Sequence, residues 1–391
     1  MSSAFYLAWK YLRFHWMKTT VLMLSIGLVI FIPLGMNHLI NQSAERFTSR
    51  AAETPLVIGT RGSATDLTLN TLYFKEPVSD PLSFKELEQL QQDSISAIPI
   101  YSQFEAKGFR IIGTSLDYFW FRNLQLASGR PFVMLGECVM GAEVARSTGA
   151  SLGSTLITTP AGAFDVAGSF PLKMTVAGIL SPTGTPDDKG ILVDVKTSWI
   201  IAGLAHGHQD LVEGPDSLLL TKSDSLVVAN PSVLSYTEIT EENLDSFHFH
   251  GDISEYPLDA ILVIPESRRQ SIQLRGRFEQ RTDNIQMIVP LAVVNDLVDT
   301  MFSVRDTVVA AGMAVVGAAL AIMTLVFWLS FKIRQQEINT MRKIGGANAS
   351  IYSMLGIEIG LTVGIGILLA LLATMILSRF GLPLVEGFLT S

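Results

Sequence analysis

Cysteine is nearly missing from this sequence. Cys138 is the only one among 391 residues, so no disulfide bond can form within the chain. Any folded domain must therefore be held together by its own hydrophobic core, which a segment of a few hundred residues can supply.

The motifs of the common hydrolases are missing too. The nearest approach to a phosphate-binding loop, 149–155, has no lysine to reach the terminal phosphates of a nucleotide. A nucleophile-elbow sequence is absent, and scattered serines, histidines and aspartates have no spacing that fixes a catalytic geometry. We expect no catalytic residues and no cofactor in this chain. Any ATP and Mg²⁺ would have to be bound by a separate subunit.

Charged residues are scarce in three long stretches: 22–39, 308–330 and 351–377. Each is long enough to cross a hydrocarbon core of roughly 30 Å, which takes about 20 helical residues. We therefore expect transmembrane helices at 19–40, 306–331 and 351–377. We expect one large domain, 41–305, outside the membrane. The tail 378–391 would be too short to cross again, so we expect it on the same, periplasmic side.

Basic residues indicate the orientation, because Lys and Arg in short flanks stay in the cytoplasm. Lys10, Arg13 and Lys18 precede the first span, and four basic residues against one acid occupy the loop between the second and third spans. We expect the amphipathic N-terminus, 1–18, and the loop, 332–350, to be cytoplasmic.

The 41–305 domain would then be extracytoplasmic. It holds 20 Lys and Arg against 32 Asp and Glu, a formal charge of −12. Such an acidic domain is not typical of nucleic-acid binding.

The first span has an alternative interpretation as a cleaved secretory signal, since a basic segment precedes it. Its apolar run is longer than that of a usual signal, and His38, Asn41 and Gln42 follow it instead of a small-x-small cleavage site. We therefore expect a retained anchor.

Two parts of the outer domain repeat one local pattern. Alternating and apolar runs predict strands at 55–59, 95–101, 260–264 and 284–289. A helix is expected at 83–92, with Ser83 as its cap and Glu86 in the capping-box position, and another at 267–279. Two such βαβ halves can form one split, ferredoxin-like sheet. The halves 50–103 and 256–300 would form a membrane-proximal α+β lobe.

The stretch between these halves, 104–255, has short apolar runs broken by Gly and Pro. This pattern predicts an inserted β-rich lobe, with one short helix at 141–147. The expected fold class is thus membrane α-helical, with three transmembrane helices, plus an α+β periplasmic domain of two lobes.

The cytoplasmic loop predicts an amphipathic helix over 334–344. Ile338, Met341 and Arg342 lie three or four residues apart and form one face, with Glu337 near it. Such a helix could fit a groove on a cytoplasmic partner, or it could lie on the lipid headgroups. Spacing alone does not choose between these.

A family resemblance rests on this loop. Residues 334–347 read Arg-Gln-Gln-Glu-Ile-Asn-Thr-Met-Arg-Lys-Ile-Gly-Gly-Ala and run into a span with Glu358. This resembles the cytoplasmic signature of FtsX/MacB/LolC-type ABC transporter permeases, R-x-x-E-I-x-x-M-R-x-[IL]-G-A before a membrane helix with an acid. Five outer segments are similar to that family's periplasmic core domain: 111–114, 127–132, 139–145, 152–155 and 176–180.

The resemblance implies a permease subunit in a bacterial inner membrane. It would act as a homo- or heterodimer, pair with a cytoplasmic ABC ATPase, and move a periplasmic substrate or adaptor protein by mechanical transmission. The residues expected to contact the ATPase are Arg334, Glu337, Ile338, Met341, Arg342, Gly345 and Gly346. MacB-type permeases have four spans, whereas three are found here, which puts in doubt how the bundle closes. An FtsX-like regulator of a periplasmic hydrolase is the alternative.

The third span carries a seam of small residues. Gly356, Gly360 and Gly364 recur every four positions, which allows close helix packing within the bundle or across a dimer. Glu358 also lies in this span, where an ionisable group is costly and indicates function. Alternatively, it reaches the cytoplasmic edge or bonds a neighbouring helix.

Four of the six histidines occur in two pairs, His206 with His208 and His248 with His250. Residues two apart on a strand point to one face, so either pair could offer two imidazoles to one zinc or copper ion. That interpretation favours a metal-responsive receptor or uptake component. A surface loop and a partly buried turn without metal are the alternative.

Overall fold

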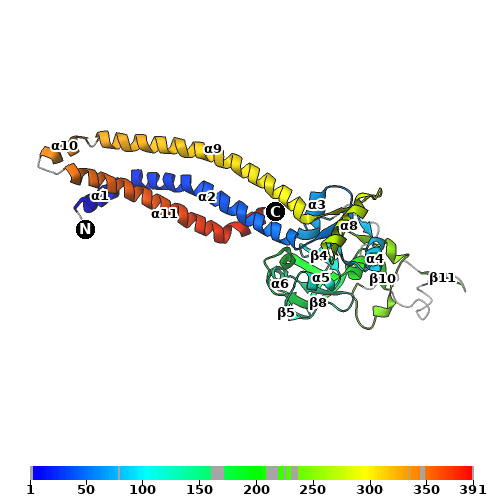
Figure 1. Cartoon of the computed structure of the whole chain (residues 1–391). Helices are drawn as coiled ribbons and strands as arrows, with labels where there is room; N and C mark the ends of the chain where they lie inside the picture. The colour runs from blue at the N-terminus through cyan, green and yellow to red at the C-terminus, as the bar shows by residue number, and fades with distance from the viewer. Residues whose placement is uncertain are drawn as a thin grey trace. The chain divides into compact units, whose positions relative to one another are not determined.

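The structure is a computed structural model. It describes residues 3–77, 80–159, 171–207, 219–223, 226–229, 237–333, 335–343 and 348–389. The chain divides into two compact units (Figure 1). One unit combines Met1–Ser49 with Asn295–Ser391, and the other is Arg50–Val294.

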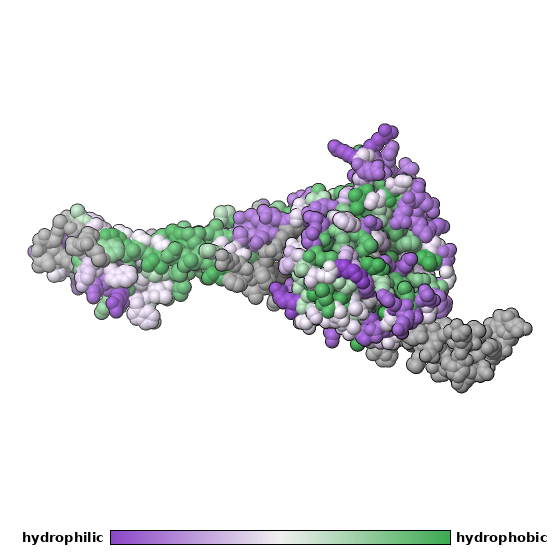
Figure 2. Space-filling model, turned by 90° about the horizontal axis from the view of Figure 1, so that it is seen from below, coloured by the Kyte–Doolittle hydropathy of each residue, from purple (hydrophilic) through white to green (hydrophobic). Residues whose placement is uncertain are grey.

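The first unit is built of helices, three of them long. They are α1 (Ser3–Phe14), α2 (Trp16–Ala52), α9 (Pro290–Ile333), α10 (Gln335–Lys343) and α11 (Asn348–Leu389). Three segments are long and apolar enough to cross a membrane: Trp16–Gln42, Val309–Ile333 and Tyr352–Ser378. Figure 2 shows apolar residues gathered along these helices, between more polar ends. Among the described residues, these three candidate spans agree with the long apolar helices that the sequence predicts.

One face of α11 is packed inside this unit. Met354, Glu358, Thr362, Gly366 and Ala370 recur every four residues and are all buried, as expected for one face of a helix. Helix α1 lies against α11, and α2 contacts it where Gly366 meets Ile26 and Gly27.

Four antiparallel strands form one half of the second unit's sheet. They are β1 (Leu56–Thr60), β3 (Ser96–Ala106), β15 (Ala260–Ile264) and β16 (Ile285–Ile288). Their order is β16-β1-β15-β3, which is the order of a split βαβ sheet. Every residue from Leu56 to Ile58 and from Ala260 to Val263 is buried, so both faces of the two central strands are covered.

Two helices accompany these strands, α4 (Lys85–Gln92) and α8 (Arg268–Glu279), and α3 (Ala64–Tyr73) lies against β1. Arg281, just after α8, forms a two-pronged ion pair with Glu86 at 2.7 and 3.0 Å. One turn earlier, within α8, Arg277 forms an ion pair with Asp93 at 2.6 Å. These pairs link the two helices directly.

The predicted start of α4 is wrong. Ser83 belongs to β2 (Leu82–Ser83), which pairs with β14 (Pro257–Leu258), and its hydroxyl donates to the Ser254 carbonyl at 2.5 Å. The helix begins at Lys85, with Phe84 in the cap position and no side-chain cap bond. Glu86 is occupied by Arg281 instead of completing a capping box.

The sheet does not stop at the expected lobe boundary, because β3 continues through residue 104. Its second half pairs with β4 (Phe109–Thr114) after a register shift between Tyr101 and Phe104. Asp259 stabilises this shift by accepting bonds from the Ser102 N–H at 2.5 Å and the Ser102 hydroxyl at 3.0 Å. One ten-stranded sheet therefore runs through both halves of the domain.

The order beyond β4 is β9-β6-β8-β5, with β7 paired to β8. These strands are β5 (Leu126–Gly129), β6 (Glu137–Met140), β7 (Thr155–Ile157), β8 (Lys173–Leu180) and β9 (Gly190–Asp194). The pairs β4–β9 and β6–β8 are parallel. Short helices complete this part: α5 (Asp117–Phe121), α6 (Ala142–Thr148), α7 (Val195–Ile201) and the 3₁₀ turn η1 (Pro186–Lys189).

Besides the β2–β14 pair, two small ribbons lie apart from the main sheet in the described part of the chain. The first pairs β10 (Ala205–Gly207) with β13 (Phe247–Phe249), and the second pairs β11 (Leu219–Ser223) with β12 (Leu226–Ala229). Two further 3₁₀ turns, η3 (Leu244–Ser246) and η4 (Ile253–Glu255), flank β13.

Candidate functional site

The expected ATPase-facing helix is α10. Ile338 is buried, whereas Arg342 is exposed and its guanidinium lies 3.3 Å from the Tyr352 hydroxyl. Glu337 and Met341 belong to the same helix. The residues outside the described part of the chain are Arg334, Gly345 and Gly346. Because Ile338 packs inside the chain, a partner could reach Arg342 but not Ile338.

The glycine seam of the third span is on the outer side of α11. A Cβ atom added to Gly356, Gly360 or Gly364 would have no described neighbour within 4 Å. The close contact inside the unit involves Gly366, where an added Cβ would lie 2.7 Å from Ile26 Cγ2, and Gly27, which approaches the Gly366 carbonyl. Sequence analysis missed this pair because the two glycines are in different spans.

Glu358 is on the packed face of α11, not on the glycine face. Its side chain is buried, and the Thr362 hydroxyl donates to its backbone carbonyl at 2.9 Å. Glu358 and the glycine seam, which occur in the same span, therefore lie on different faces of α11.

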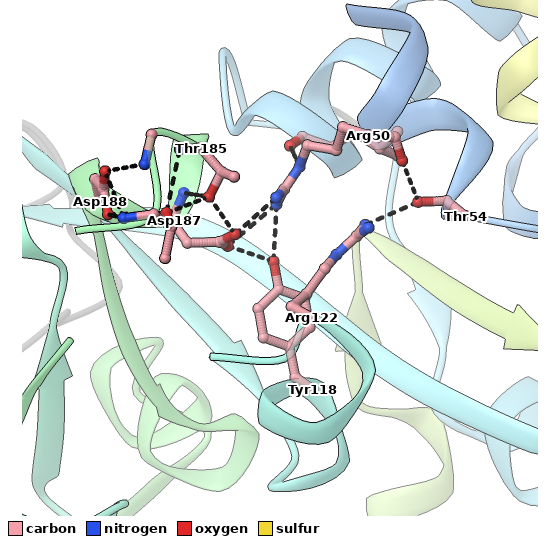
Figure 3. A network of polar contacts seen from close by, with 10 residues as sticks. Arg50, Thr54, Tyr118, Arg122, Thr185, Asp187 and Asp188 are labelled. Carbon is pink, nitrogen blue, oxygen red and sulfur yellow. Dashed lines mark hydrogen bonds and ion pairs between the residues drawn. The ribbon is translucent and has the colours of Figure 1, made fainter. Parts of the chain in front are cut away.

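A buried polar network lies where α2 ends, and no sequence pattern indicated it (Figure 3). Arg50, in the last turn of α2, contacts Asp187 through Nη1 at 2.6 Å and Nη2 at 3.1 Å. Its Nε donates to the Leu72 carbonyl at 2.6 Å, and Nη2 also reaches the Tyr118 hydroxyl at 3.0 Å. One side chain therefore joins α2 to α3, α5 and η1.

The Asp187 carboxylate is fully occupied. Besides Arg50, it accepts from the Tyr118 hydroxyl at 2.7 Å and the Thr185 hydroxyl at 2.9 Å. Thr185 is the cap of η1 and is followed by Pro186 at the first position of that turn. The Thr-Pro-Asp sequence could have predicted the turn, but it does not indicate that Asp187 pairs with Arg50.

A second arginine extends the network. Arg122, which ends α5, donates to the Thr54 hydroxyl at 2.9 Å, and Thr54 in turn donates to the Arg50 carbonyl at 3.0 Å. The Arg122 guanidinium also lies over the Phe121 ring, 4.6 Å from its centroid. Figure 3 shows Arg50 in the last turn of α2 and Arg122 directed to Thr54, just after that helix.

These groups change one another's proton affinity. Burial would raise the pKa of Asp187, but the adjacent Arg50 charge and the hydrogen bonds hold it below its usual value. Burial, followed by the Asp187 charge, raises the pKa of Tyr118 to about 12. The pKa of Arg122 is lowered, by burial first and by the neighbouring Arg50 charge. Asp187 is therefore ionised at neutral pH and Tyr118 is a neutral donor.

Three of the four paired histidines meet in this domain. The rings of His206, His248 and His250 lie 4.6 to 5.0 Å apart, centroid to centroid. His208 lies outside the described residues. Each pair alone was expected to offer two imidazoles, whereas the structure brings one histidine from the first pair to both of the second.

The sequence of this chain matches one protein-family model. Residues 19–242 match the family model described as the MacB-like periplasmic core domain. No curated protein matches the chain.

Two solved structures are similar at low identity. The periplasmic region of MacB from Actinobacillus actinomycetemcomitans is 11% identical, covers 62% of this chain and 92% of its own, and has a TM-score of 0.36. The extracellular domain of the noncanonic ABC-type transporter YknZ from Gram-positive bacteria is also 11% identical. That match covers 60% of this chain and 98% of the other, with a TM-score of 0.33.

The family model spans more than half of the chain, including most of the first candidate membrane span and most of the sheet domain. The chain therefore belongs to the MacB-like periplasmic core domain family and is an ABC transporter permease of the MacB/FtsX type.

Proposed function

We propose that this chain couples ATP hydrolysis by a separate cytoplasmic ATPase to movement of its own extracytoplasmic domain, for export or extraction of a periplasmic or membrane substrate. The observation that carries the proposal is the end of α2. This helix is unbroken from the candidate span Trp16–Gln42 to Ala52, and its last turn is tied by Arg50 to Asp187 inside the sheet domain.

Mechanical transmission requires a stiff connection at the end of the moving helix. A buried, two-pronged arginine–carboxylate pair has fixed geometry, and breaking it leaves an unpaired buried charge. Because Arg50 also holds Leu72 and Tyr118, displacement of the last turn of α2 would act on three other segments at once.

Transmission also requires that helices move together. The close approach of Gly27 to the Gly366 carbonyl allows α2 and α11 to pack backbone to backbone, as small residues do in membranes. Helix α10 precedes α11 in the chain, so force applied at Arg342 would enter the packed pair through α11.

The assembly would be a dimer of permeases bound to the ATPase in the bacterial inner membrane. The most apolar 18-residue window of Val309–Ile333 has no residue buried within the described chain. The outer glycines of α11 are similarly open. Both surfaces would face lipid or a second permease.

The test uses the intact protein, purified in detergent from its native membranes beside Arg342→Ala and Asp187→Asn variants. We expect an ATPase to co-purify with the wild type and with Asp187→Asn, and to be lost from Arg342→Ala. Arg277→Ala, which removes an exposed pair with Asp93, is the matched control and should retain it.

Coupling is then measured by hydrogen exchange in the Arg50–Val294 domain with and without ATP. The wild-type complex should show an ATP-dependent change, and Asp187→Asn should show a smaller one although the ATPase is still bound. If no ATPase is found with the wild type, the coupling proposal is wrong. An equal ATP response in Asp187→Asn would exclude the Arg50 connection as the path.

A further inference from the structure

The histidine cluster is built by strand pairing. In the ribbon of β10 and β13, His206 lies directly opposite His248. His250 follows β13 and lies two positions after His248, which places it toward the same face. The ligand-type atoms of all three side chains lie within 4.8 Å of one another.

The opposite face of this ribbon is apolar. Phe247 and Phe249 alternate with the histidines and pack against the hydrophobic core, while His248 and His250 are exposed. Gly207 allows the contact, because a Cβ atom there would lie 2.6 Å from the Phe247 ring. The phenylalanines thus fix which way the imidazoles face.

The backbone beneath the cluster is also fixed. The hydroxyl of buried Tyr256 lies 2.9 Å from the Leu204 carbonyl and 2.8 Å from the His250 carbonyl. In addition, the His250 N–H donates to Leu204 at 3.2 Å. The Tyr256 ring packs edge-on against fully buried Trp199 at 5.1 Å. The two segments that carry the histidines are therefore anchored to one core residue.

One of the imidazoles is oriented as metal ligands are. His248 Nδ1 lies 3.1 Å from the Ser246 carbonyl, so this nitrogen carries the proton and donates it. Metal-binding histidines commonly have their second nitrogen held by a carbonyl in this way.

We propose that His206, His248 and His250 bind one divalent transition-metal ion of the zinc type. Three imidazoles without a thiolate suit Zn²⁺ or Cu²⁺ and not the hard cations Mg²⁺ or Ca²⁺. In a four-coordinate site, three protein ligands leave one position open to water or to a group from another molecule.

The spacing is compatible with that ion. Zn–N bonds of about 2.0–2.1 Å in a tetrahedron place ligand nitrogens roughly 3.3 Å apart. The ligand-type atoms now lie within 4.8 Å of one another. Rotation of the two exposed imidazoles would shorten these distances to about that value. The bound ion would then tie β10 to β13.

The test uses the full chain in detergent, stripped with EDTA and dialysed. Co²⁺ is titrated while the visible d–d absorption is followed, and Zn²⁺ binding is measured by calorimetry. We expect one ion per chain with a tetrahedral Co²⁺ spectrum. Losing an outer partner of a metal ligand costs about 10–100-fold in affinity. We therefore expect His206→Ala, His248→Ala and His250→Ala each to weaken binding by about 10-fold or more.

Three further variants make the test specific. His15→Ala removes a histidine of the helical unit and should bind like the wild type. Tyr256→Phe keeps all three imidazoles but releases the two carbonyls, and it should give weaker binding with an altered Co²⁺ spectrum. His208→Ala tests the membership of the ligand set.

Two results would overturn the proposal. The first is absence of saturable binding to the wild type, or equal binding to a His206/His248/His250→Ala triple variant. The second is loss of binding in His208→Ala with full binding in His206→Ala. Far-ultraviolet circular dichroism of each variant establishes that its domain is folded, which is expected because His248 and His250 are exposed.

Discussion

Arg50 and Asp187, 137 positions apart in the sequence, form a buried ion pair with two nitrogen–oxygen contacts of 2.6 and 3.1 Å. The arginine ends a helix that includes a membrane span, and the aspartate lies in a turn between two strands of the sheet domain. Their side chains are 5% and 1% exposed. Such burial makes the pair sensitive to loss of either partner.

Asp187→Ala should therefore unfold the sheet domain at lower denaturant concentration. Removing one partner of a buried pair costs about 3–5 kcal/mol, because the other charge remains buried and unpaired. Urea unfolding of the purified chain, followed by tryptophan fluorescence, measures this through fully buried Trp199.

Arg277→Ala is the control for that measurement. Arg277 and Asp93 are 56% and 47% exposed, and exposed pairs contribute about 0.2–1 kcal/mol. Equal destabilisation by the two substitutions would contradict the special position of Asp187.

The same pair predicts how stability depends on pH. The folded-state pKa of Asp187 is held below its unfolded value by Arg50 and the hydrogen bonds. Its stabilising contribution is thus complete above the unfolded value, about 3.9. It is lost as the pH falls through the folded value. Arg50 and Tyr118 do not titrate in that range.

We expect Asp187→Asn to lose less stability than the wild type between about pH 5 and pH 2. Urea midpoints measured across that range give the two slopes. Parallel slopes would mean that the pKa of Asp187 is not lowered in the folded protein.

Strand prediction succeeded where burial dominates the local sequence. The strand predicted at 260–264 agrees with β15, Ala260–Ile264, because its continuous apolar run is covered on both faces. Ser267 caps α8 by accepting from the Gln270 N–H. Ser83 has the same local pattern, but its hydroxyl donates a hydrogen bond to the Ser254 carbonyl instead. Local sequence does not reveal which of two such serines meets a distant acceptor.

For the candidate sites too, local features could be predicted from the sequence, whereas contacts between distant segments could not. Each His-x-His pair was visible in the sequence, but their meeting depends on β10 pairing with β13, which local periodicity does not predict. Arg50 was not identified at all, since a single arginine after an apolar helix is common. Ile338 and Arg342 belong to one helix, as predicted, but Ile338 is buried and Arg342 is exposed. That difference depends on packing with other helices, which local periodicity does not reveal.

Packing between α2 and α11 predicts a difference between two glycines of one helix. Gly366→Ala would place a methyl group 2.7 Å from Ile26 Cγ2 and 3.1 Å from the Met23 carbonyl. Overpacking of this kind costs about 1–3 kcal/mol. The thermal midpoint of the detergent-purified chain should therefore fall.

Gly360→Ala is the matched change on the outer face, where no described atom lies within 4 Å. It should leave the midpoint of the isolated chain unchanged, and a bulkier Gly360→Leu should weaken a permease dimer in crosslinking experiments. A lower midpoint for Gly360→Ala than for Gly366→Ala would contradict the assignment of the two faces.

Asp259 provides a last prediction, at the point where β3 changes partner. Its carboxylate accepts from the Ser102 N–H, the Ser102 hydroxyl and the Gln103 side-chain amide. Asp259→Ala would leave the buried Ser102 N–H without this acceptor, at a cost of about 1–3 kcal/mol. Burial also raises the pKa of Asp259 above its usual value despite these bonds, so ionisation of this carboxyl opposes folding as the pH rises.

The neutral amide of Asp259→Asn still offers an oxygen to Ser102 and has no charge to bury. We therefore expect Asp259→Asn to be less destabilised than Asp259→Ala in urea at neutral pH, with the gap between Asn and wild type narrowing as the pH rises from about 4 toward 7. If alanine and asparagine were equally destabilising, the acceptor oxygen would be irrelevant. The register shift between Tyr101 and Phe104 would then be held by side-chain packing alone.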